Sequence, residues 1–546
     1  MEAIRRVIST PCAAPADPEF SFEMLAEAAN KNFCVLQKYN MSLDKAIEDQ
    51  KDSTLGYGSE FRHIEQLQQI ISLHPVWKHM KLILTLGSDW PLTELSNDLK
   101  RLDVGDALSF GNHKRTTEKP DLLRSLIEKD VTYGYGVVIT LDKIMIVPGI
   151  LLSPTNIMKQ NTIDEHGRIC GKDRLTHNQS YKWISETSVN SRVIKDSLLP
   201  CKFGACIKRL VNWVVASRRL YPNCWIIATK IDYKSAYCRC HLKRKTEIQT
   251  CTQLPDENLD IIALILTFGG APGPYEWGDI SEPICDLAMR ILHDPAWDPK
   301  NFHAPNPDLA PPPVILDDSI PFGIGKQLIM NVHVDPRGIT DIYIGDTTGL
   351  TVDIEGSDNI TCLERATLLA IHATAWPKHN NEPIPREDTA TRNKLLAEAM
   401  LEETKKILGW VFDFRRLTIS LPNNKCIAWS EAIQEIMDKQ IVTAKDLEKN
   451  IGQLVHLGLV ILFVHHFMSR LRELRELREL RELRRRATHR RSVKITERYA
   501  ADLKLMIFML KKANKGIDMN MVVYRNPTHA YRLDSCPMGL RGYINT

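Results

Sequence analysis

The sequence lacks a long hydrophobic run and any paired metal-binding cysteine motif. Its longest apolar stretch, LGLVILFV at 457–464, is far shorter than the roughly 20 residues that cross a bilayer, and the first residues lack the apolar core of a signal peptide. The 13 cysteines are scattered, with no CxxC matched to a second CxxC or to HxxxH. We therefore expect a soluble intracellular protein, cytoplasmic or nuclear, with reduced thiols and no membrane partner.

The net charge is also small. The 546 residues carry a formal charge of only +4, with 43% hydrophobic and 25% charged residues, and this composition is typical of a globular protein. Overall charge therefore identifies no partner. The chain is too long for one hydrophobic core, since domains hold roughly 100 to 200 residues, and we expect three or four units.

Hydrophobic periodicity divides the chain into regions. Segments such as FSFEMLAEAANKNFCVLQKY place apolar side chains at helical spacing and predict a mainly helical region over 1–150, whose role the pattern does not indicate. Short β-rich runs follow within 151–428, interrupted at 293–314 by a Pro- and Asp-rich segment that we interpret as a surface insertion. Helices return over 429–517, before a last segment at 518–546. The pattern predicts an α+β fold.

One internal repeat, RELRELRELREL, occupies Arg472 to Leu483. On a helix with 3.6 residues per turn, a period of three moves each Leu back by about 60°, so the leucines form no continuous stripe and no zipper. Residues 470–491 hold ten Arg against four Glu, a balance of +6. Two interpretations stay open: a basic arm that binds nucleic acid, or an expansion that lengthened an exposed helix kept soluble by Arg–Glu pairs.

The stretch TKIDYKSAY places Asp232 at the end of an apolar strand, CWIIATKI, with Tyr237 five residues later. A nucleotidyl transferase needs a carboxylate on a rigid strand, because that carboxylate binds Mg²⁺ ions that bridge a triphosphate and activate the attacking hydroxyl. An Asp that ends a strand is more often a cap or turn residue, so this motif alone predicts little.

Three further stretches gain meaning only in combination. LTFGGAPGPYEW (266–277) is a Gly- and Pro-rich loop that leads into a helix. GRICGKDRLTHNQS (167–180) is a polar, hairpin-like segment that offers Lys172 and Arg174, and an Arg fork suits a triphosphate. DIYIGDTTG (341–349) has the pattern of a strand and turn that carry carboxylates. Each alone is equally compatible with an ordinary turn or a solvated charged face.

The order and spacing of these motifs, followed by LGW in KILGWVFDFRRLTISLP, resembles the reverse transcriptases of retrotransposons over about residues 160–520. LTFGGAPGPYEWG and IGQLVHLG are similar to retroelement families of protists and fungi, including the tyrosine-recombinase group. The resemblance implies a right-hand polymerase fold, with fingers and an antiparallel palm sheet over 151–428 and a helical thumb or connection over 429–517. It implies an RNA-directed DNA polymerase that uses Mg²⁺ or Mn²⁺, with an RNA template, RNA–DNA duplex and deoxynucleoside triphosphates as partners.

The resemblance also assigns roles to residues. Asp232 would be the first catalytic carboxylate and a metal ligand, and Asp346 would be a second. Tyr237 is similar to the aromatic gate that excludes a 2′ hydroxyl. The other nucleotide-binding residues would be Arg174, Lys172, Phe268 and Gly269. The primer grip would be Leu408, Gly409 and Trp410.

The chain departs from the family at the hairpin tip. The family motif is Tyr-x-Asp-Asp, whose first Asp is a direct metal ligand, whereas this sequence has Gly345 there. Asp341 cannot replace it, because four strand residues span roughly 13 Å and a metal–oxygen bond about 2.1 Å. If the missing contact is worth about 4 kcal/mol, the rate falls roughly a thousandfold. We expect the hairpin to form, since Gly-Asp suits a turn, but with severely impaired chemistry.

The last segment, LDSCPMGLRGY (533–543), resembles the first strand of a ribonuclease H domain, with Asp534 as its first metal ligand. Because the other carboxylates would lie further along, we expect a truncated and inactive start of that domain. Two other hypotheses stay open. One is a polymerase cleft that binds RNA–DNA duplex without catalysis, and the other is an interaction protein built on residues 1–150 and the Arg-rich repeat.

Overall fold

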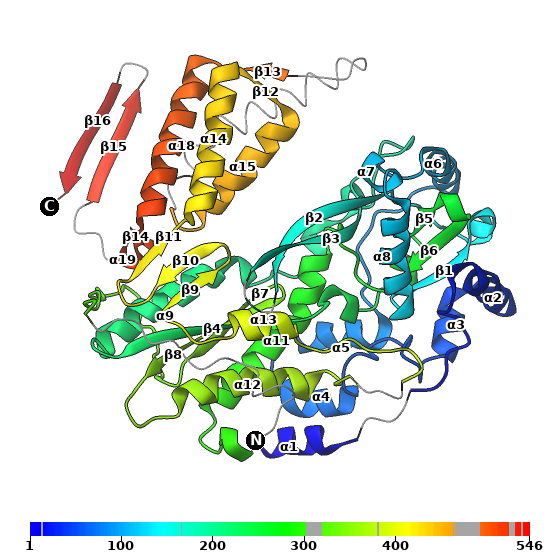
Figure 1. Ribbon diagram of the computed structural model, residues 1–546, viewed down its shortest axis with the longest axis horizontal. Helices are drawn as coiled ribbons and strands as arrows, with labels where there is room; N and C mark the ends of the chain where they lie inside the picture. The colour runs from blue at the N-terminus through cyan, green and yellow to red at the C-terminus, as the bar shows by residue number, and fades with distance from the viewer. Residues whose placement is uncertain are drawn as a thin grey trace.

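The computed structural model describes residues 1–11, 15–164, 166, 168–301, 319–378, 382–461, 464, 492–523, 530–536 and 539–545. The Arg-rich repeat and most of the 293–314 segment lie outside the described residues. Helices and antiparallel sheets share the described part of the chain (Figure 1). The predicted α+β class with antiparallel sheets is confirmed.

Helices dominate the first 132 residues. The helices are α1 (Glu2–Ser9), α2 (Leu25–Lys38), α3 (Leu43–Asp49), α4 (Ile64–Ile71), α5 (Trp77–Leu86), α6 (Asn97–Phe110), α7 (Lys114–Thr117) and α8 (Pro120–Thr132). Local signals set the ends of α6: the Ser96 hydroxyl accepts a hydrogen bond from the Leu99 amide at its start, and Gly111, with φ +71°, follows its last residue.

This helical region shares its core with later parts of the chain. Strand β1 (Gly136–Thr140) pairs with β6 (Leu259–Ala263), which also pairs with β5 (Thr252–Leu254). Leu67 of α4 and Trp277, both fully buried, belong to one hydrophobic cluster. Residues on both sides of position 150 therefore fold together.

The central sheet has the order β4–β8–β7, with β4 at Trp225–Asp232, β8 at Asp346–Asp353 and β7 at Ile339–Tyr343. Its strands alternate between two cores, because successive strand residues point to opposite faces. Ile227 and Ile231 join one buried cluster, whereas Ile226 joins the other. The helices that contact this sheet include α9 (Cys206–Leu220), α11 (Gly273–His293), α12 (Asn359–Thr374) and α13 (Arg392–Glu398).

A second sheet follows in the order β14–β11–β10–β9. Its strands are β9 (Thr404–Ile407), β10 (Trp410–Asp413), β11 (Thr418–Ser420) and β14 (Ile517–Asp518). Three helices stand together above it (Figure 1): α14 (Asn423–Lys439), α15 (Ala444–Gly458) and α18 (Glu497–Lys515). Short elements complete this part: α13 (Arg392–Glu398), β12 (Ile441–Thr443), β13 (Ser492–Lys494) and α19 (Met519–Val522).

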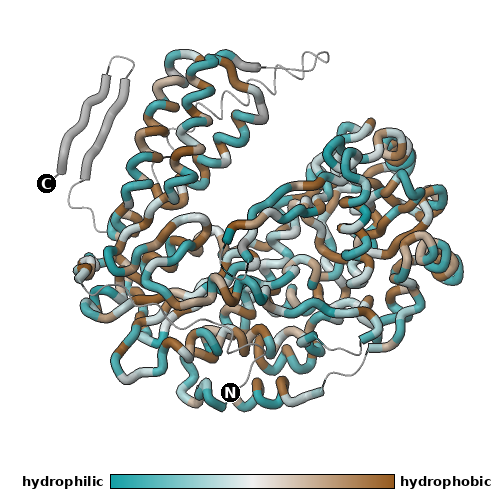
Figure 2. Tube along the Cα trace, in the orientation of Figure 1, coloured by the Kyte–Doolittle hydropathy of each residue, from teal (hydrophilic) through white to brown (hydrophobic). Residues whose placement is uncertain are grey.

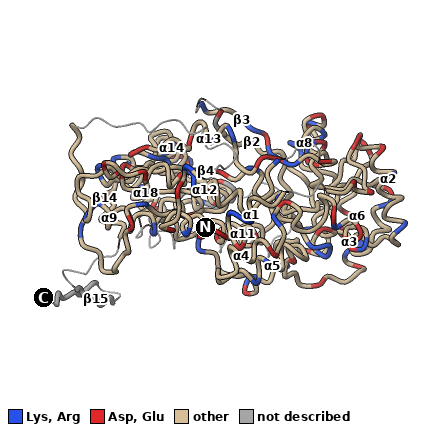
Figure 3. The backbone as a smooth tube through the Cα atoms, turned by 90° about the horizontal axis from the view of Figure 1, so that it is seen from below, with Lys and Arg blue, Asp and Glu red and all other residues tan. Residues whose placement is uncertain are grey.

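A long hairpin, β2 (Thr155–Ile163) with β3 (Ile169–His177), lies across the central sheet from α14, α15 and α18 (Figure 1). Its residues are mostly hydrophilic (Figure 2), and Lys and Arg positions follow it in the view of Figure 3. This is the polar, hairpin-like segment that the sequence predicts, and it begins before residue 167. The short helix α10 (Arg244–Glu247) lies further along the chain.

The last described elements are the paired strands β15 (Ala530–Cys536) and β16 (Gly539–Asn545). Asp534 lies opposite Arg541 in this ladder, but its side chain lies outside the described part, so its predicted role as a metal ligand stays a prediction. Among the described residues, no helix is long and apolar enough to span a membrane.

Candidate functional site

The hairpin of β7 and β8 brings two predicted site residues together. Strands β4 and β8 are antiparallel, and Asp232, the last residue of β4, lies directly opposite Asp346, the first residue of β8. Tyr343 and Asp346 close the hairpin, so its turn consists of Ile344 and Gly345. The carboxylates of Asp232 and Asp346 are within hydrogen-bonding reach of each other. Strand register therefore places the two predicted carboxylates side by side.

The turn is held in a strained form. Ile344 has φ +57°, in the left-handed region that β-branched residues avoid, whereas Gly345 lies outside that region. The indole nitrogen of Trp277 donates to the Ile344 carbonyl at 2.8 Å, and the Tyr233 amide donates to the Gly345 carbonyl at 3.0 Å. The hairpin forms as expected, but for another reason: its turn residues are Ile344 and Gly345, and the conformational freedom of glycine is not used.

Two lysine ammonium groups face the carboxylates. Lys394 of α13 lies 2.9 Å from Asp232 Oδ1 and 3.9 Å from Asp346 Oδ1. Lys230 of β4 lies 3.3 Å from Asp346 Oδ1 and 3.2 Å from Glu398 Oε2. The other oxygen of Asp232 accepts a hydrogen bond from the Thr391 hydroxyl at 2.8 Å. Both carboxylates are therefore already bound by groups of this chain.

Burial and these charges shift the two carboxylates in opposite directions. Burial, together with the nearby Asp346, raises the pKa of Asp232 to about 6, against the attraction of Lys394. Burial also acts to raise the pKa of Asp346, but Lys230, the hydrogen bond with Asp232 and Lys394 outweigh it and hold that pKa below its ordinary value. When the pair takes up a proton, that proton therefore goes to Asp232, because two adjacent buried charges repel each other.

These residues do not fit a two-metal centre. Two Mg²⁺ ions about 3.5 to 4 Å apart require several carboxylate oxygens in nearly octahedral arrangements. Over the part of the chain that the structure describes, no group of three His, Cys, Asp or Glu side chains could hold a metal ion. The two aspartates present already engage ammonium and hydroxyl groups. The Mg²⁺ or Mn²⁺ requirement stays a prediction.

Three of the predicted nucleotide-binding residues lie in contact with one another. The rings of Tyr237, in the short 3₁₀ helix Tyr237–Arg239, and Phe268 stack with centroids 5.1 Å apart, and the Arg174 guanidinium lies 5.1 Å from the Phe268 centroid. Arg174 comes from β3, so hairpin and loop meet here. Lys172, on the same strand, is exposed and close enough to Asp232 for the two charges to interact. Phe268 therefore contacts both Tyr237 and Arg174, and the three side chains form a cationic and aromatic cluster.

The glycine-rich loop is packed by its own protein. A Cβ atom at Gly269, whose φ is +138°, would lie 1.8 Å from the His177 carbonyl oxygen, and one at Gly270 would lie 2.0 Å from the Trp90 ring. Neither position accepts a larger residue. Contacts within the chain therefore require glycine at both positions, and the role of Gly269 in nucleotide binding stays a prediction.

The predicted primer-grip residues divide into two kinds. Leu408 and Gly409 form the two-residue turn between β9 and β10, both with positive φ, as hairpin turns of type I′ require. They line a pocket of about 390 Å³ together with Asp346, Lys230, Glu398, Tyr343, Lys406, Lys425, His456 and Leu459. Trp410 is fully buried and stacks on His456 at 5.6 Å. Trp410 therefore supports the pocket wall without lining it.

Asp341 has a structural role. Its carboxylate accepts two hydrogen bonds from the Arg209 guanidinium, at 2.7 Å from Nε and 2.6 Å from Nη2. It is 7% exposed. The conclusion that Asp341 cannot supply the missing ligand agrees with this pairing.

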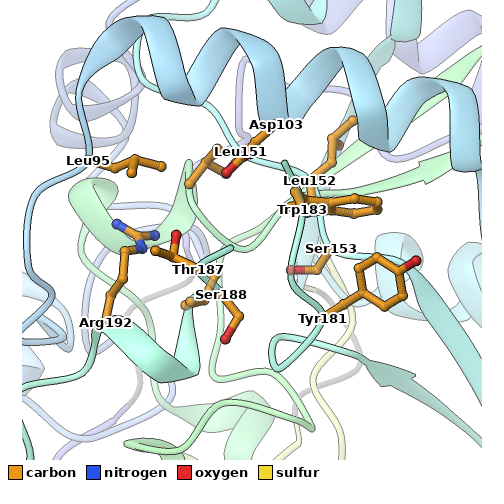
Figure 4. A pocket seen from close by; sticks show the side chains of 11 residues that line it. Leu95, Asp103, Leu151, Leu152, Ser153, Tyr181, Trp183, Thr187, Ser188 and Arg192 are labelled. Atoms are coloured by element: carbon orange, nitrogen blue, oxygen red, sulfur yellow. The ribbon is translucent and has the colours of Figure 1, made fainter. Parts of the chain in front are cut away.

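A much smaller cavity lies among α6 and the loops around 151–153 and 181–192 (Figure 4). Its volume of about 10 Å³ is room for about one water molecule. Its two charged lining residues are already paired with neighbours: Asp103 accepts a hydrogen bond from the Ser185 hydroxyl at 2.6 Å, and Arg192 donates to Gln249 at 2.7 Å. We therefore assign it a structural role.

Three residues of the site were not predicted from the sequence: Lys230, Thr391 and Lys394. A signal for Lys230 was present, because residues two apart on a strand share a face, which puts Lys230 beside Asp232. Thr391 and Lys394 come from a segment far along the chain. Nothing in their local sequence indicates that they reach Asp232.

Comparison with known proteins gives weak similarities. No family model matches the chain, and no curated protein matches it. A structure of the foamy viral protease–reverse transcriptase dRH in complex with double-stranded DNA is 12% identical with a TM-score of 0.40, covering 88% of this chain and 64% of that one. The same viral protein with an RNA/DNA hybrid is 13% identical with a TM-score of 0.38, covering 92% and 48%. This chain thus spans less than two thirds of the length of either structure, and similarities of this size assign it no activity.

Proposed function

We propose that this chain is a reverse-transcriptase-type polymerase domain with strongly impaired nucleotidyl transfer. The β2–β3 hairpin and the 266–277 loop would be its fingers, the β4–β8–β7 sheet its palm, and α14, α15 and α18 its thumb. One observation carries the proposal: Asp232 lies directly opposite Asp346, beside a turn in which Gly345 stands where a third carboxylate would be.

The impairment follows from the charges around that pair. A site with two carboxylates offers two divalent cations less negative charge than a site with three carboxylates does. The second cation should therefore bind weakly. If this contact is worth about 4 kcal/mol, transfer slows roughly a thousandfold. The alternative is a protein that binds RNA–DNA duplex without catalysis, and the lysines of the 390 Å³ pocket favour it.

Primer extension with Mg²⁺ or Mn²⁺ tests the catalytic part. The variant Gly345→Asp is a sound comparison, because a Cβ at position 345 would lie 3.4 Å from the Ala236 Cβ, which is ordinary contact, and the backbone there is not left-handed. We expect extension by Gly345→Asp to exceed that of the unchanged chain by on the order of a hundredfold or more. Gly345→Asp combined with Asp232→Asn is the inactive control. Equal extension by the unchanged chain and Gly345→Asp would refute the impairment.

Duplex binding tests the polymerase-type surface separately. Lys406 and Lys425 border the pocket, where phosphates of a bound strand would release counterions and make binding salt-dependent. We expect the affinity for a labelled RNA–DNA duplex, measured by fluorescence anisotropy, to fall steeply with salt. In Lys406→Gln/Lys425→Gln the slope of log affinity against log salt should shrink by about 1 to 2. Lys243→Gln, at a surface pair with Asp89, is the matched control, and affinity that ignores salt would contradict the proposal.

A further inference from the structure

The carboxylates of the site face cations that belong to the chain. Lys394 faces both aspartates, with its ammonium nitrogen 2.9 Å from Asp232 and 3.9 Å from Asp346, so one positive charge of the chain lies against both carboxylates. We propose that Lys394 is a built-in cation that closes the carboxylate pair, and that the segment 387–402 must loosen before a divalent cation can bind there. This deepens the proposed function and rests on it, because it names what regulates that same site.

The charges form a nearly balanced network. Asp232, Asp346 and Glu398 face Lys230 and Lys394, so three carboxylates meet two ammonium groups. Their side chains are between 11% and 29% exposed, and charges in such partly buried places are screened less than surface charges. Removal of one lysine would leave excess negative charge at the two aspartates, which favours an added cation.

Both oxygens of Asp232 are occupied. Oδ1 pairs with the Lys394 ammonium and Oδ2 accepts from the Thr391 hydroxyl, while the Thr391 amide donates to the Asp232 carbonyl at 3.1 Å. A divalent cation that binds Asp232 would therefore displace a group of residues 391–394. A divalent cation and residues 391–394 therefore compete for the same two oxygens of Asp232.

The segment that carries these groups is fastened along β4. The Lys234 amide donates to the Thr389 carbonyl at 3.1 Å, and the Thr229 hydroxyl donates to the Ala399 carbonyl at 2.7 Å. Beyond α13, Ala228 and Glu402 exchange two backbone hydrogen bonds of 3.0 and 3.1 Å. With contacts on both sides, the backbone holds Lys394 over the carboxylates, so removing the ammonium need not release the segment.

The Gly345 and Lys394 effects differ in kind. Gly345 removes a ligand, whereas Lys394 engages a ligand that remains. Lys394→Gln should therefore strengthen metal binding even where position 345 stays glycine. Binding of metal without nucleic acid is the appropriate measurement, because it does not depend on turnover.

The experiment is a Mn²⁺ titration of the full chain, followed by electron paramagnetic resonance without nucleic acid. We expect Lys394→Gln to bind Mn²⁺ roughly tenfold more tightly than the unchanged chain, since one ammonium facing the carboxylates is gone. Lys394→Arg keeps the charge and should bind no more tightly, and Lys243→Gln removes one distant charge and should match the unchanged chain. Affinity of Lys394→Gln no higher than that of Lys243→Gln would overturn the proposal.

Two further measurements test the same proposal independently of the Lys394→Gln variant. Thr391→Val frees Asp232 Oδ2 without changing charge and should raise Mn²⁺ affinity severalfold, which serves if Lys394→Gln does not fold. Saturating Mn²⁺ should also speed hydrogen exchange within 388–399 in the unchanged chain but not in Asp232→Asn; binding without faster exchange would overturn the proposal. Duplex binding, measured on the same proteins, reports on the proposed function alone, so that the two failures remain distinguishable.

Discussion

Asp341 and Asp346 lie on the two strands of one hairpin and are held in opposite ways. Asp341 is buried and receives two parallel hydrogen bonds from the Arg209 guanidinium. Asp346 borders the 390 Å³ pocket and faces Lys230 and Lys394 at 3.3 and 3.9 Å. The planar Arg fork fixes a carboxylate, whereas Lys is a point charge on a flexible stem. The partner of an acidic residue therefore distinguishes a structural carboxylate from one that can exchange its cation.

Arg209→Leu should give the largest change in stability. It leaves Asp341 buried without a cation, and loss of one partner of such a pair costs about 3 kcal/mol or more. Chemical denaturation should show this loss of unfolding free energy. Arg209→Leu/Asp341→Leu should recover most of it, and Arg6→Leu, at an exposed pair with Glu2, should change nothing measurable. If Arg209→Leu costs no more than Arg6→Leu, the pair is not structural.

Trp277→Phe should cause the second largest loss of unfolding free energy. Trp277 is fully buried, and its indole nitrogen donates to the carbonyl of the strained residue Ile344. The variant loses this hydrogen bond and leaves a small void, which together cost about 2 kcal/mol. We expect the loss in thermal or chemical unfolding, with faster hydrogen exchange in the β7–β8 hairpin. Unchanged exchange there would show that the turn holds its conformation by other contacts.

His456, which lines the 390 Å³ pocket, should make a smaller contribution to stability that depends on pH. Burial, with a smaller contribution from Lys425, lowers the pKa of His456 to about 4, against about 6.5 in an unfolded chain. As the pH falls, His456 is therefore protonated at a higher pH in the unfolded chain than in the folded one. The contribution of neutral His456 to the free energy of unfolding is complete above pH 6.5 and is lost as the pH falls toward 4.

His456→Phe keeps a ring against Trp410 but cannot be protonated. We expect its free energy of unfolding to fall by about 1 kcal/mol less than that of the unchanged chain when the pH is lowered from 7 to 4.5, a figure reduced for the partial solvent exposure of His456. Unfolding free energies of both proteins at pH 7 and pH 4.5 measure it. An identical acid-induced loss in both proteins would show that His456 protonates normally in the folded state.

Lys394→Gln should have the smallest effect on stability. Lys394 and Asp232 are 23% and 18% exposed, and Asp232 keeps its hydrogen bond from the Thr391 hydroxyl when the ammonium is removed, so we expect a loss of under about 1 kcal/mol. The variant should therefore unfold almost as the unchanged chain does, although its affinity for Mn²⁺ changes roughly tenfold. A loss as large as that of Arg209→Leu would erase the distinction between the two aspartates.

Local patterns predicted much of the fold. The apolar run CWIIATKI forms β4 and ends at Asp232, and KILGWVFDFRRLTISLP forms β9, β10 and β11. The loop after Leu266 leads into α11, which begins at Gly273. Turn and strand signals are short-range, so a single sequence is enough to read them.

The candidate site was predicted only in part. Asp232 and Asp346 meet as expected, and Tyr237, Phe268 and Arg174 contact one another. Trp410 turned out to be buried, because its strand faces the second core. The space beside Gly269, in the loop before α11, is occupied by the His177 carbonyl of β3. Such contacts join segments that are far apart in the sequence, and local hydrophobic periodicity does not predict them.

The order of residues along the chain sets which groups are available: two carboxylates at the ends of neighbouring strands, a glycine at position 345 and a turn able to close between them. Alternation of strand residues and turn chemistry act over a few residues, so the sequence carries them directly. Which cation each carboxylate meets depends instead on the packing of helices against the sheet. Arg209 reaches Asp341 and Lys394 reaches Asp232 because helices α9 and α13 pack beside the sheet. Electrostatic partnership depends on distances in space, and packing sets those distances.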